Sequence, residues 1–371
     1  MIVGAKINAE YFVLDLGTLG GAASFSQGEQ TINSAGQIVG QSRLAGGVVT
    51  HGFRTRPMAA MDFSSDLGTL GGTNSYAFSI NTSGQVVGYS NYNSTTNVHA
   101  FRTTASGGIT SETDLGTFSG NNSYGTGIND SGQVVGWSGD TLGSERAFRT
   151  TATGTLSTAS NLGTLPNGTA SYATAINNAG VVTGYAASNG PGLYHAIRVA
   201  AGATITAASD LGTLGGTSSS AYAINDAGQV VGFSYLAGNT ARHAFRTTGT
   251  GGITVTSDIG SLGGESQAFS INNMGQVVGR SFLADGTTNH AFFCDVTGNM
   301  QDLNSMIPAN SGWILSDAHG INNAGQISGT GVFGGQTHAF ALLLPEPTCL
   351  SLIGLFGIVI LRRTKSRRLM R

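Results

Sequence analysis

Histidine and aspartate recur together along this chain and are its most conspicuous candidates for chemistry. Six of the seven histidines begin the motif His-Ala-Phe or a close variant of it. An imidazole beside a carboxylate can hold a metal ion or move a proton, so a repeated His–Asp set needs an explanation. Four of these histidines are followed by an aspartate 15 residues later: His51 by Asp66, His99 by Asp114, His195 by Asp210 and His243 by Asp258.

The spacing predicts a structural role for these pairs. In a hairpin with a central two-residue turn, positions 15 apart lie opposite each other on one face. One copy has Arg146 in place of His and Asn161 in place of Asp, so the two exceptions coincide. We therefore predict a cross-strand His–Asp hydrogen bond in most copies, with His338 and Asp15 as a closing pair. No catalytic residue, metal ligand or cofactor is predicted, because neighbouring sheets would hold these histidines on the order of 10 Å apart.

A repeat of about 48 residues organises the chain. From Ile32-Asn33 to Ile321-Asn322 the pair Ile-Asn recurs in seven copies, at steps of 47 to 50 residues. Each copy also contains Asp-Leu-Gly or a variant, then Gly-Gln-Val-Val-Gly or a variant, then His-Ala-Phe. Short apolar runs between turns rich in Gly, Asn, Asp and Ser are typical of strands, so each copy predicts four short strands.

Seven four-stranded copies predict an all-β chain, a seven-bladed β-propeller over residues 11–344. A linear β-solenoid is the alternative, although its coils are usually shorter and its ends need caps. The first copy begins with an unpaired strand at 11–17, and the last copy ends with one at 338–344. Pairing these two would close a ring and remove two exposed edges.

Composition excludes several classes of protein. The chain has 371 residues, of which 58 are Gly, 40% are apolar and 10% are charged, so neither disorder nor a Pro-rich linker is expected. Residues 1–344 carry 11 basic and 18 acidic side chains, a net charge of −7. The basic surface that binding of nucleic acid requires is therefore not expected. Two cysteines cannot form a disulfide framework.

The three linked motifs resemble the HAF repeat of bacterial extracellular proteins, over roughly residues 12–342. The resemblance implies a secreted repeat protein. It implies no catalytic activity that can be assigned to particular residues.

The C-terminal segment, residues 345–371, resembles a PEP-CTERM sorting signal. It consists of Pro345-Glu346-Pro347, an apolar run over 348–361 and a basic cluster that begins with Arg362 and Arg363. The resemblance implies export, a transient anchor in the inner membrane, an exosortase as processing partner and a place in the cell envelope or biofilm matrix. As a helix the 14-residue run would span about 21 Å, short of a bilayer core of about 30 Å. A simple tail anchor is the alternative.

The first ten residues lack the long apolar run of a secretory signal peptide. We interpret residues 1–10 as the remnant of a leader and expect the natural start to lie upstream.

Aromatic residues recur directly after the Val-Val-Gly motif, where they could stack against sugar rings: Tyr89, Trp137, Tyr185 and Phe233. The alternative is that they pack between sheets. We predict a non-enzymatic protein that binds extracellular material, with polysaccharide as its candidate partner. The alternative is a carbohydrate-active enzyme with its site at the mouth of the ring. A deep funnel with two close carboxylates would favour the enzyme, and a plugged or evenly polar mouth would favour the scaffold.

Overall fold

The computed structural model describes residues 11–93, 96–141, 143–188, 190 and 192–343. Within these residues the regular elements are β-strands and 3₁₀-helices of three or four residues. The predicted all-β class is therefore confirmed. The sorting signal and the apolar run at 348–361 lie outside the described residues.

The strands form seven small antiparallel sheets, numbered here in chain order. Sheet 1 consists of β2 (Gly20–Phe25), β3 (Val39–Leu44) and β4 (Thr50–Arg54), and sheet 2 of β5 (Gly71–Ile80), β6 (Val86–Tyr92) and β7 (Val98–Arg102). Sheet 3 consists of β8 (Ser123–Ile128), β9 (Val134–Gly139) and β10 (Glu145–Arg149), and sheet 4 of β11 (Ser171–Ile176), β12 (Val182–Ala187) and β13 (Tyr194–Val199). Sheet 5 consists of β14 (Gly215–Ile224), β15 (Val230–Leu236) and β16 (Arg242–Arg246). Sheet 6 consists of β17 (Gly263–Ile271), β18 (Val277–Leu283), β19 (Asn289–Cys294) and β20 (Met300–Asp302). Sheet 7 consists of β21 (Trp313–Ile321), β22 (Ile327–Phe333), β23 (Gln336–Leu343) and β1 (Phe12–Asp15).

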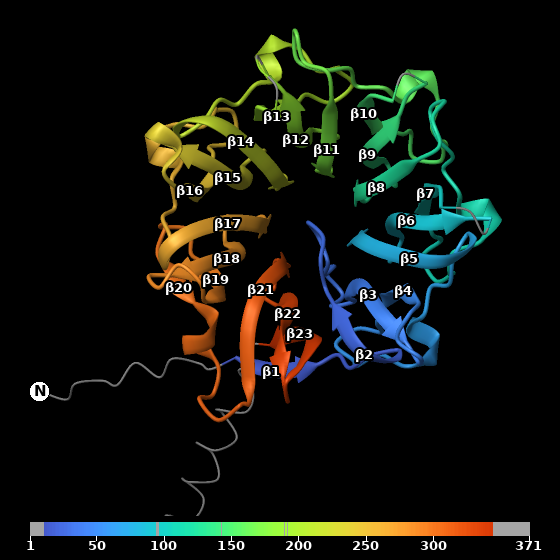
Figure 1. Ribbon diagram of the computed structural model, residues 1–371, viewed down its shortest axis with the longest axis vertical. Coiled ribbons are helices and arrows are strands. Elements are labelled where there is room, and N and C mark those ends of the chain that lie inside the picture. Colours follow the sequence, from blue (N-terminus) through green and yellow to red (C-terminus); the bar gives the residue numbers. More distant parts are fainter. Residues whose placement is uncertain (1–10, 94–95, 142, 189, 191, 344–371) are drawn as a thin grey trace, which may run out of the picture.

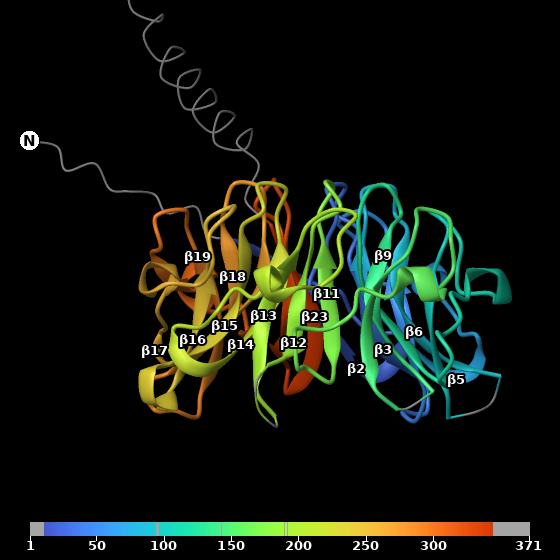
Figure 2. The same ribbon diagram turned by 90° about the horizontal axis from the view of Figure 1, so that it is seen from above.

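The seven sheets stand around a common centre, each with its first strand of the repeat innermost (Figure 1). Seen from the side, they form a low cylinder of upright strands (Figure 2). Sheet 7 joins the two ends of the described chain, because β1 pairs with β23 from Phe12↔Leu343 to Asp15↔Phe340. The closing pairing predicted from the two unpaired strands is thus confirmed.

The expectation of four strands in every repeat is wrong for five sheets, which have three strands each. In these sheets the Asp-Leu-Gly segment contributes one isolated bridge, such as Phe53↔Asp66 and Phe101↔Asp114. A 3₁₀-helix precedes the bridge, as at η1 (Phe63–Ser65), and a glycine with positive φ follows it, as at Gly68 (φ +75°). Both features end extended pairing, because neither has strand dihedrals.

The other 3₁₀-helices are η2 (Ser111–Thr113), η3 (Thr158–Ser160), η4 (Ala207–Ser209), η5 (Ala237–Asn239), η6 (Val255–Ser257) and η7 (Leu303–Met306).

The core consists of apolar clusters between neighbouring sheets. Its largest fully buried side chains include the Phe of the His-Ala-Phe motif, for example Phe101 and Phe148. Phe101 lies opposite Gly88 of the Val-Val-Gly motif. A Cβ on Gly88 would come within 1.8 Å of the Tyr76 carbonyl oxygen and 3.0 Å of the Phe101 ring. This close approach explains why the motif requires glycine there.

A closed ring of hydrogen bonds joins all seven sheets at the ends of the innermost strands. Each Asn of the Ile-Asn pair donates its side-chain amide to the backbone carbonyl oxygen of the next Asn around the ring, at 3.0–3.1 Å. The last bond runs from Asn322 to Asn33 and closes the circle. We call this set the asparagine ring; its members are Asn33, Asn81, Asn129, Asn177, Asn225, Asn272 and Asn322.

Each ring asparagine is also fixed within its own turn. Its Oδ1 accepts the backbone N–H four residues later, for example that of Gln133 in the case of Asn129 (3.0 Å). In six sheets its amide donates a second bond to a glutamine side chain, and at Asn177 the corresponding residue is Val181. The asparagine amides are buried and paired, which is the condition under which burial of an amide is tolerated.

The asparagine ring predicts a large stability cost for a small substitution. Asn129→Ala removes the bonds to Asn177 and to Gln133, and we expect it to lower the free energy of unfolding by about 2–4 kcal/mol. Urea unfolding of the purified protein measures this change. Asn121→Ala, at an exposed loop position, is the matched control and should change stability by less than about 0.5 kcal/mol. Equal losses in both variants would contradict a structural role of the ring.

Candidate binding face and channel

The structure brings together every His–Asp pair that the sequence predicts. The Nδ1 atom of each histidine lies 2.8–3.0 Å from the nearer carboxylate oxygen in the pairs His51–Asp66, His99–Asp114, His195–Asp210, His243–Asp258 and His338–Asp15. His290 and Asp302 form a sixth pair at 2.7 Å, in the copy whose spacing is 12. All six pairs lie toward the outer strands of their sheets, so they do not share a site.

The geometry behind these pairs differs from the predicted hairpin. Asp66 lies opposite Phe53, two residues beyond His51, so the His–Asp contact is diagonal. The connection is a loop with a 3₁₀-helix in place of a two-residue turn. The copy that has Arg146 in place of His and Asn161 in place of Asp does not pair these two side chains. Arg146 donates to the Thr169 carbonyl oxygen and lies 3.5 Å from Asp140. Asn161 instead accepts the N–H of Gly163.

Hydrogen bonding shifts the titration of these groups. The bond to Asp210 raises the pKa of His195 above 6.5, against the opposing effect of burial. Burial by itself would raise the pKa of Asp210, but bonds from His195 and from the Gly212 N–H bring it below 3.8. His243 and Asp258 shift in the same directions for the same reasons.

A continuous belt of aromatic rings crosses sheets 2, 3 and 4. The rings on the first two strands of each of these sheets are stacked, as in Tyr124–Trp137 (4.8 Å, 17°), and Tyr194 on the third strand of sheet 4 meets Tyr185 edge to face. Rings of neighbouring sheets meet edge to face, as in Trp137–Tyr172 (5.5 Å, 72°). Every ring is half-buried. We call this set the aromatic belt; its members are Tyr76, Tyr89, Tyr124, Trp137, Tyr172, Tyr185 and Tyr194.

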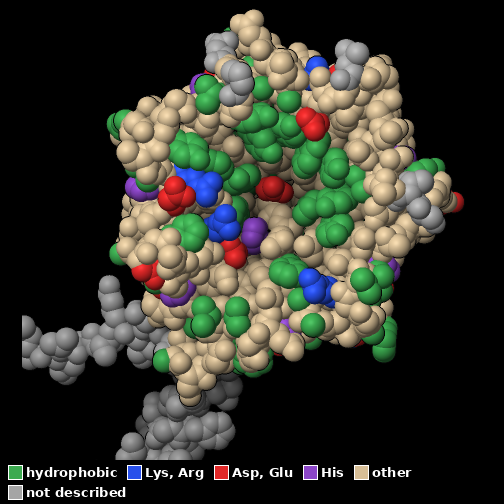
Figure 3. All heavy atoms as spheres, viewed as in Figure 1, with side chains coloured by type: hydrophobic (Ala, Val, Ile, Leu, Met, Phe, Trp, Pro, Cys, Tyr) green, Lys and Arg blue, Asp and Glu red, His purple; other side chains and the backbone are tan. Residues whose placement is uncertain are grey.

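Three of the four predicted stacking residues belong to this belt. Phe233, the fourth, is apart from it and carries the Arg242 guanidinium over its face at 5.2 Å. The alternative of packing between sheets is also partly correct, because belt rings contact rings of the next sheet. Figure 3 shows hydrophobic side chains gathered around the central hollow of one face, with Arg side chains on the opposite side of that hollow.

A pocket of about 460 Å³ opens beside the belt in sheet 3. Its walls include the rings of Tyr124 and Trp137, and its polar groups include Asn121, Asp140 and Glu145. Glu145 Oε2 accepts the hydroxyl of Tyr172 at 2.8 Å. Burial, with this bond as a second cause, raises the pKa of Tyr172 well above 10.0, so the phenol stays protonated and donates. Apolar walls with a few polar groups are typical of a ligand site.

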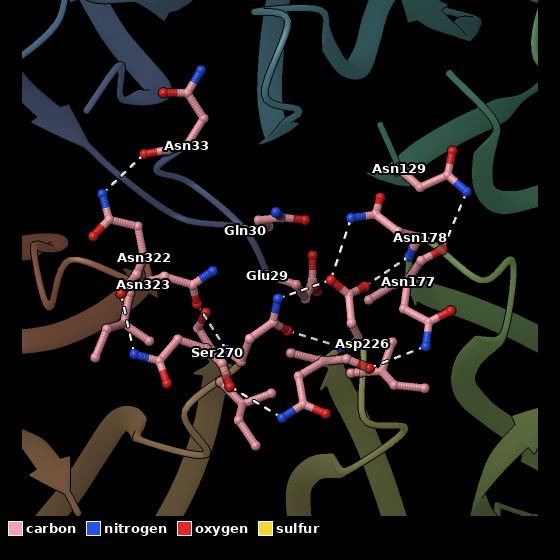
Figure 4. A pocket seen from close by; sticks show the side chains of 18 of the residues that line it. Glu29, Gln30, Asn33, Asn129, Asn177, Asn178, Asp226, Ser270, Asn322 and Asn323 are labelled. Carbon is pink, nitrogen blue, oxygen red and sulfur yellow. Dashed lines mark hydrogen bonds between the residues drawn. The ribbon is translucent and has the colours of Figure 1, made fainter. Parts of the chain in front are cut away.

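The first repeat departs from the others at the centre of the ring. Nine positions separate Ser24 from Asn33, whereas six separate Ser75 from Asn81, so sheet 1 contains three additional residues. They place Glu29 and Gln30 in a central pocket of about 240 Å³ that the asparagine ring surrounds (Figure 4). The inserted segment therefore occupies part of the centre of the ring. Sequence analysis missed Glu29, and the irregular spacing was the signal that could have found it.

His319, the histidine outside the repeat pattern, packs close to this segment. Its ring stacks on Phe269 (4.3 Å, 7°). Burial lowers the pKa of His319 to about 4, so it is neutral at pH 7.

Stability should depend on pH through the His–Asp pairs. Because the histidine pKa is raised in the folded protein, the pair contributes stability below pH 6.5, and this contribution is lost as pH rises through the folded-state pKa of the histidine. Because the aspartate pKa is lowered, the pair also contributes stability above pH 3.8, and this contribution is lost as pH falls through the folded-state pKa of the aspartate. We expect the contribution to peak between these limits, at roughly 0.5–1 kcal/mol per pair.

Urea unfolding across pH, for the wild type and for a double variant with His195→Asn and His243→Asn, measures this contribution. The variant should lose most at about pH 5. A difference that does not vary with pH would contradict the assignment.

Comparison with known proteins matches residues 194–341 to a family described as "Protein of unknown function (DUF3466)". A search of the curated proteins found no match. No helix in the described part of the chain has the length and apolar content that crossing a membrane requires. In the same part, His, Cys, Asp and Glu side chains form no group of three that could hold a metal ion. The resemblances to HAF repeats and to a PEP-CTERM signal stay predictions.

Proposed function

We propose that the seven sheets are the blades of a β-propeller, and that the protein is a non-enzymatic, exported scaffold that binds extracellular polysaccharide. The observation that carries the proposal is the aromatic belt. Seven half-buried rings form one surface across three sheets. Large aromatic surfaces left partly in solvent mark binding sites.

The chemistry of the belt suits carbohydrate. The C–H faces of sugar rings pack against aromatic faces, and hydroxyls require polar partners nearby. Trp137 and Tyr124 supply the apolar wall of the sheet 3 pocket, and Asn121 and Glu145 supply polar groups. Glu145 accepts the Tyr172 hydroxyl at Oε2, which fixes the carboxylate at the wall of the pocket. Repetition over three sheets allows several weak contacts along one chain.

The placement of the chain ends supports a surface role. Phe12 pairs with Leu343, Leu342 with Ile327, and Ile327 with Ile321. Both ends of the described chain therefore lie at the asparagine-ring end of the cylinder. Tyr172 precedes Asn177 by five residues of strand, or about 16 Å. An anchor at residues 348–361 would thus hold the ring by one end and leave the belt directed away from the membrane.

An exported carbohydrate-active enzyme is the second candidate, because Asp140 and Glu145 line the same pocket. Both carboxylates are already engaged, Asp140 with Arg146 and with the Ser144 N–H, and Glu145 with Tyr172. The inserted segment with Glu29 and Gln30 also favours the binding protein over the enzyme, because it occupies space at the centre of the ring that an active-site funnel would need. Release of reducing sugar from any polysaccharide, lost in Glu145→Gln, would support the enzyme and overturn the scaffold.

Binding should depend on the belt. Trp137→Ala removes the largest ring and should weaken polysaccharide binding by about tenfold, a loss typical of one good aromatic contact. Affinity electrophoresis in gels that contain single polysaccharides measures the change. Phe63→Ala, a fully exposed aromatic on η1, is the matched control and should bind as the wild type does. Equal retardation of all three proteins would contradict the belt as the binding surface.

Localisation should depend on the C-terminal segment. Replacement of Pro345, Glu346 and Pro347 by alanine should leave the protein in the membrane fraction, because the proposed processing enzyme no longer recognises it. Fractionation of the native host with an antibody to residues 11–343 follows the protein. Substitution of Arg362 and Arg363 by glutamine tests the basic stop separately. Wild-type distribution of both variants would contradict the sorting proposal.

A further inference from the structure

The strongest unassigned feature is the carboxylate of Glu29 at the centre of the ring. In six repeats the innermost strand continues through this region with one β-bulge, and the first repeat has three additional residues there. Gln30 forms a parallel bridge with Ser79 of the neighbouring sheet, which fixes the inserted segment in place. Gly28 lies against Phe78, where a Cβ would come within 2.1 Å of the carbonyl oxygen. The insertion is therefore a packed element with a defined position.

Glu29 has no counter-ion there. Among the described residues its carboxylate is associated with its own backbone N–H and with no Lys, Arg or His side chain. Placing a carboxyl group in a confined space without a partner costs stability. Local costs of this kind concentrate at functional sites.

The surrounding pocket is acidic and rich in oxygen. Its lining includes Asp130 and Asp226 besides Glu29, and it contains no basic residue. Both aspartates accept hydrogen bonds from Asn178, and Asp226 also accepts one from Asn273 (2.8 Å). The oxygens of the asparagine ring are bonded to the ring and its turns. Glu29 is thus the acceptor with most capacity for a ligand, in a cavity of about 240 Å³.

We infer that the central pocket binds a small organic ammonium ion, with the Glu29 carboxylate as its counter-ion. A primary ammonium presents three N–H donors, which match one carboxylate and the aspartates at the rim. The phenol groups of Tyr185 and Tyr222 lie within electrostatic reach of Glu29. A bare divalent metal fits less well, because it requires a larger set of ligands than the pocket gathers.

Binding should be coupled to a proton. Burial raises the pKa of Glu29 to about 8. The charged and titratable groups near its carboxylate are Asp130 and Asp226, which line the same pocket, and the phenols of Tyr185 and Tyr222. Neutral His319 forms a hydrogen bond with the backbone of Gly28 in the inserted segment. Asp317 and Arg280 lie within electrostatic reach of His319. Since the cation requires the ionised carboxylate, affinity should fall about tenfold per pH unit below pH 8 and level off above it.

Calorimetric titration of the full-length protein in mild detergent with putrescine tests the site, with uncharged 1,4-butanediol as the matched ligand. We expect saturable binding of putrescine, no binding of butanediol and a loss of about tenfold or more in Glu29→Gln. Glu112→Gln, on η2 at the exposed surface, should bind like the wild type.

A second variant guards against misfolding of the first. Deletion of residues 28–30 gives sheet 1 the spacing of sheet 2, so it should fold and should not bind putrescine. Thermal unfolding verifies both variants. Equal affinity of wild type and Glu29→Gln, binding of butanediol, or absence of putrescine binding by the wild type would overturn the inference. Tighter binding of Ca²⁺ that is also lost in Glu29→Gln would overturn the ligand class.

Discussion

The asparagine ring is the interaction on which the rest of the structure depends. Each sheet is too small to be stable by itself, and seven of them must meet at one axis in a fixed order. A side-chain amide from each sheet bonds to the backbone of the next, and the seventh bond returns to the first sheet. Since the bonds form a closed circle, a displacement of one sheet strains its two neighbours. Buried amide bonds of this kind define geometry as well as stability.

Contacts farther from the axis repeat the same logic. A buried serine, for example Ser123, accepts the N–H of Ala100 in the preceding sheet and donates to the Gly116 carbonyl oxygen. Arg102 reaches from sheet 2 to the Gly132 carbonyl oxygen in the turn of sheet 3 (2.8 Å). The His–Asp pair then holds the outer segment where the strand has ended. Polar bonds at three distances from the axis therefore tie each sheet to its neighbours or to its own edge, and apolar side chains fill the space between them.

The features proposed to bind ligands are departures from this repeating pattern. The aromatic belt covers sheets 2 to 4 and is replaced in sheets 5 and 6 by aromatic rings beneath Arg242 and Arg280. The inserted segment with Glu29 occurs in sheet 1 alone. Because the ring is stabilised by equivalent contacts in every sheet, individual positions can change with little effect on the fold. A repeat architecture thus separates the residues that hold the structure from those free to acquire a function.

The sequence alone determined the repeat, the all-β class, the pairing of the first and last strands and the His–Asp pairs, because each depends on local periodicity or on spacing within one copy. It also identified Tyr89, Trp137 and Tyr185 as a set. Only the tertiary structure decided that Asp66 lies opposite Phe53, that the Ile-Asn pairs form a ring, and that the aromatic residues of three sheets touch. It also placed Glu29 in the central pocket. The ring bonds and the aromatic contacts join residues of different repeats, and the positions of Asp66 and Glu29 depend on local irregularities, a 3₁₀-helix and an insertion. No local pattern specifies how such segments meet in space.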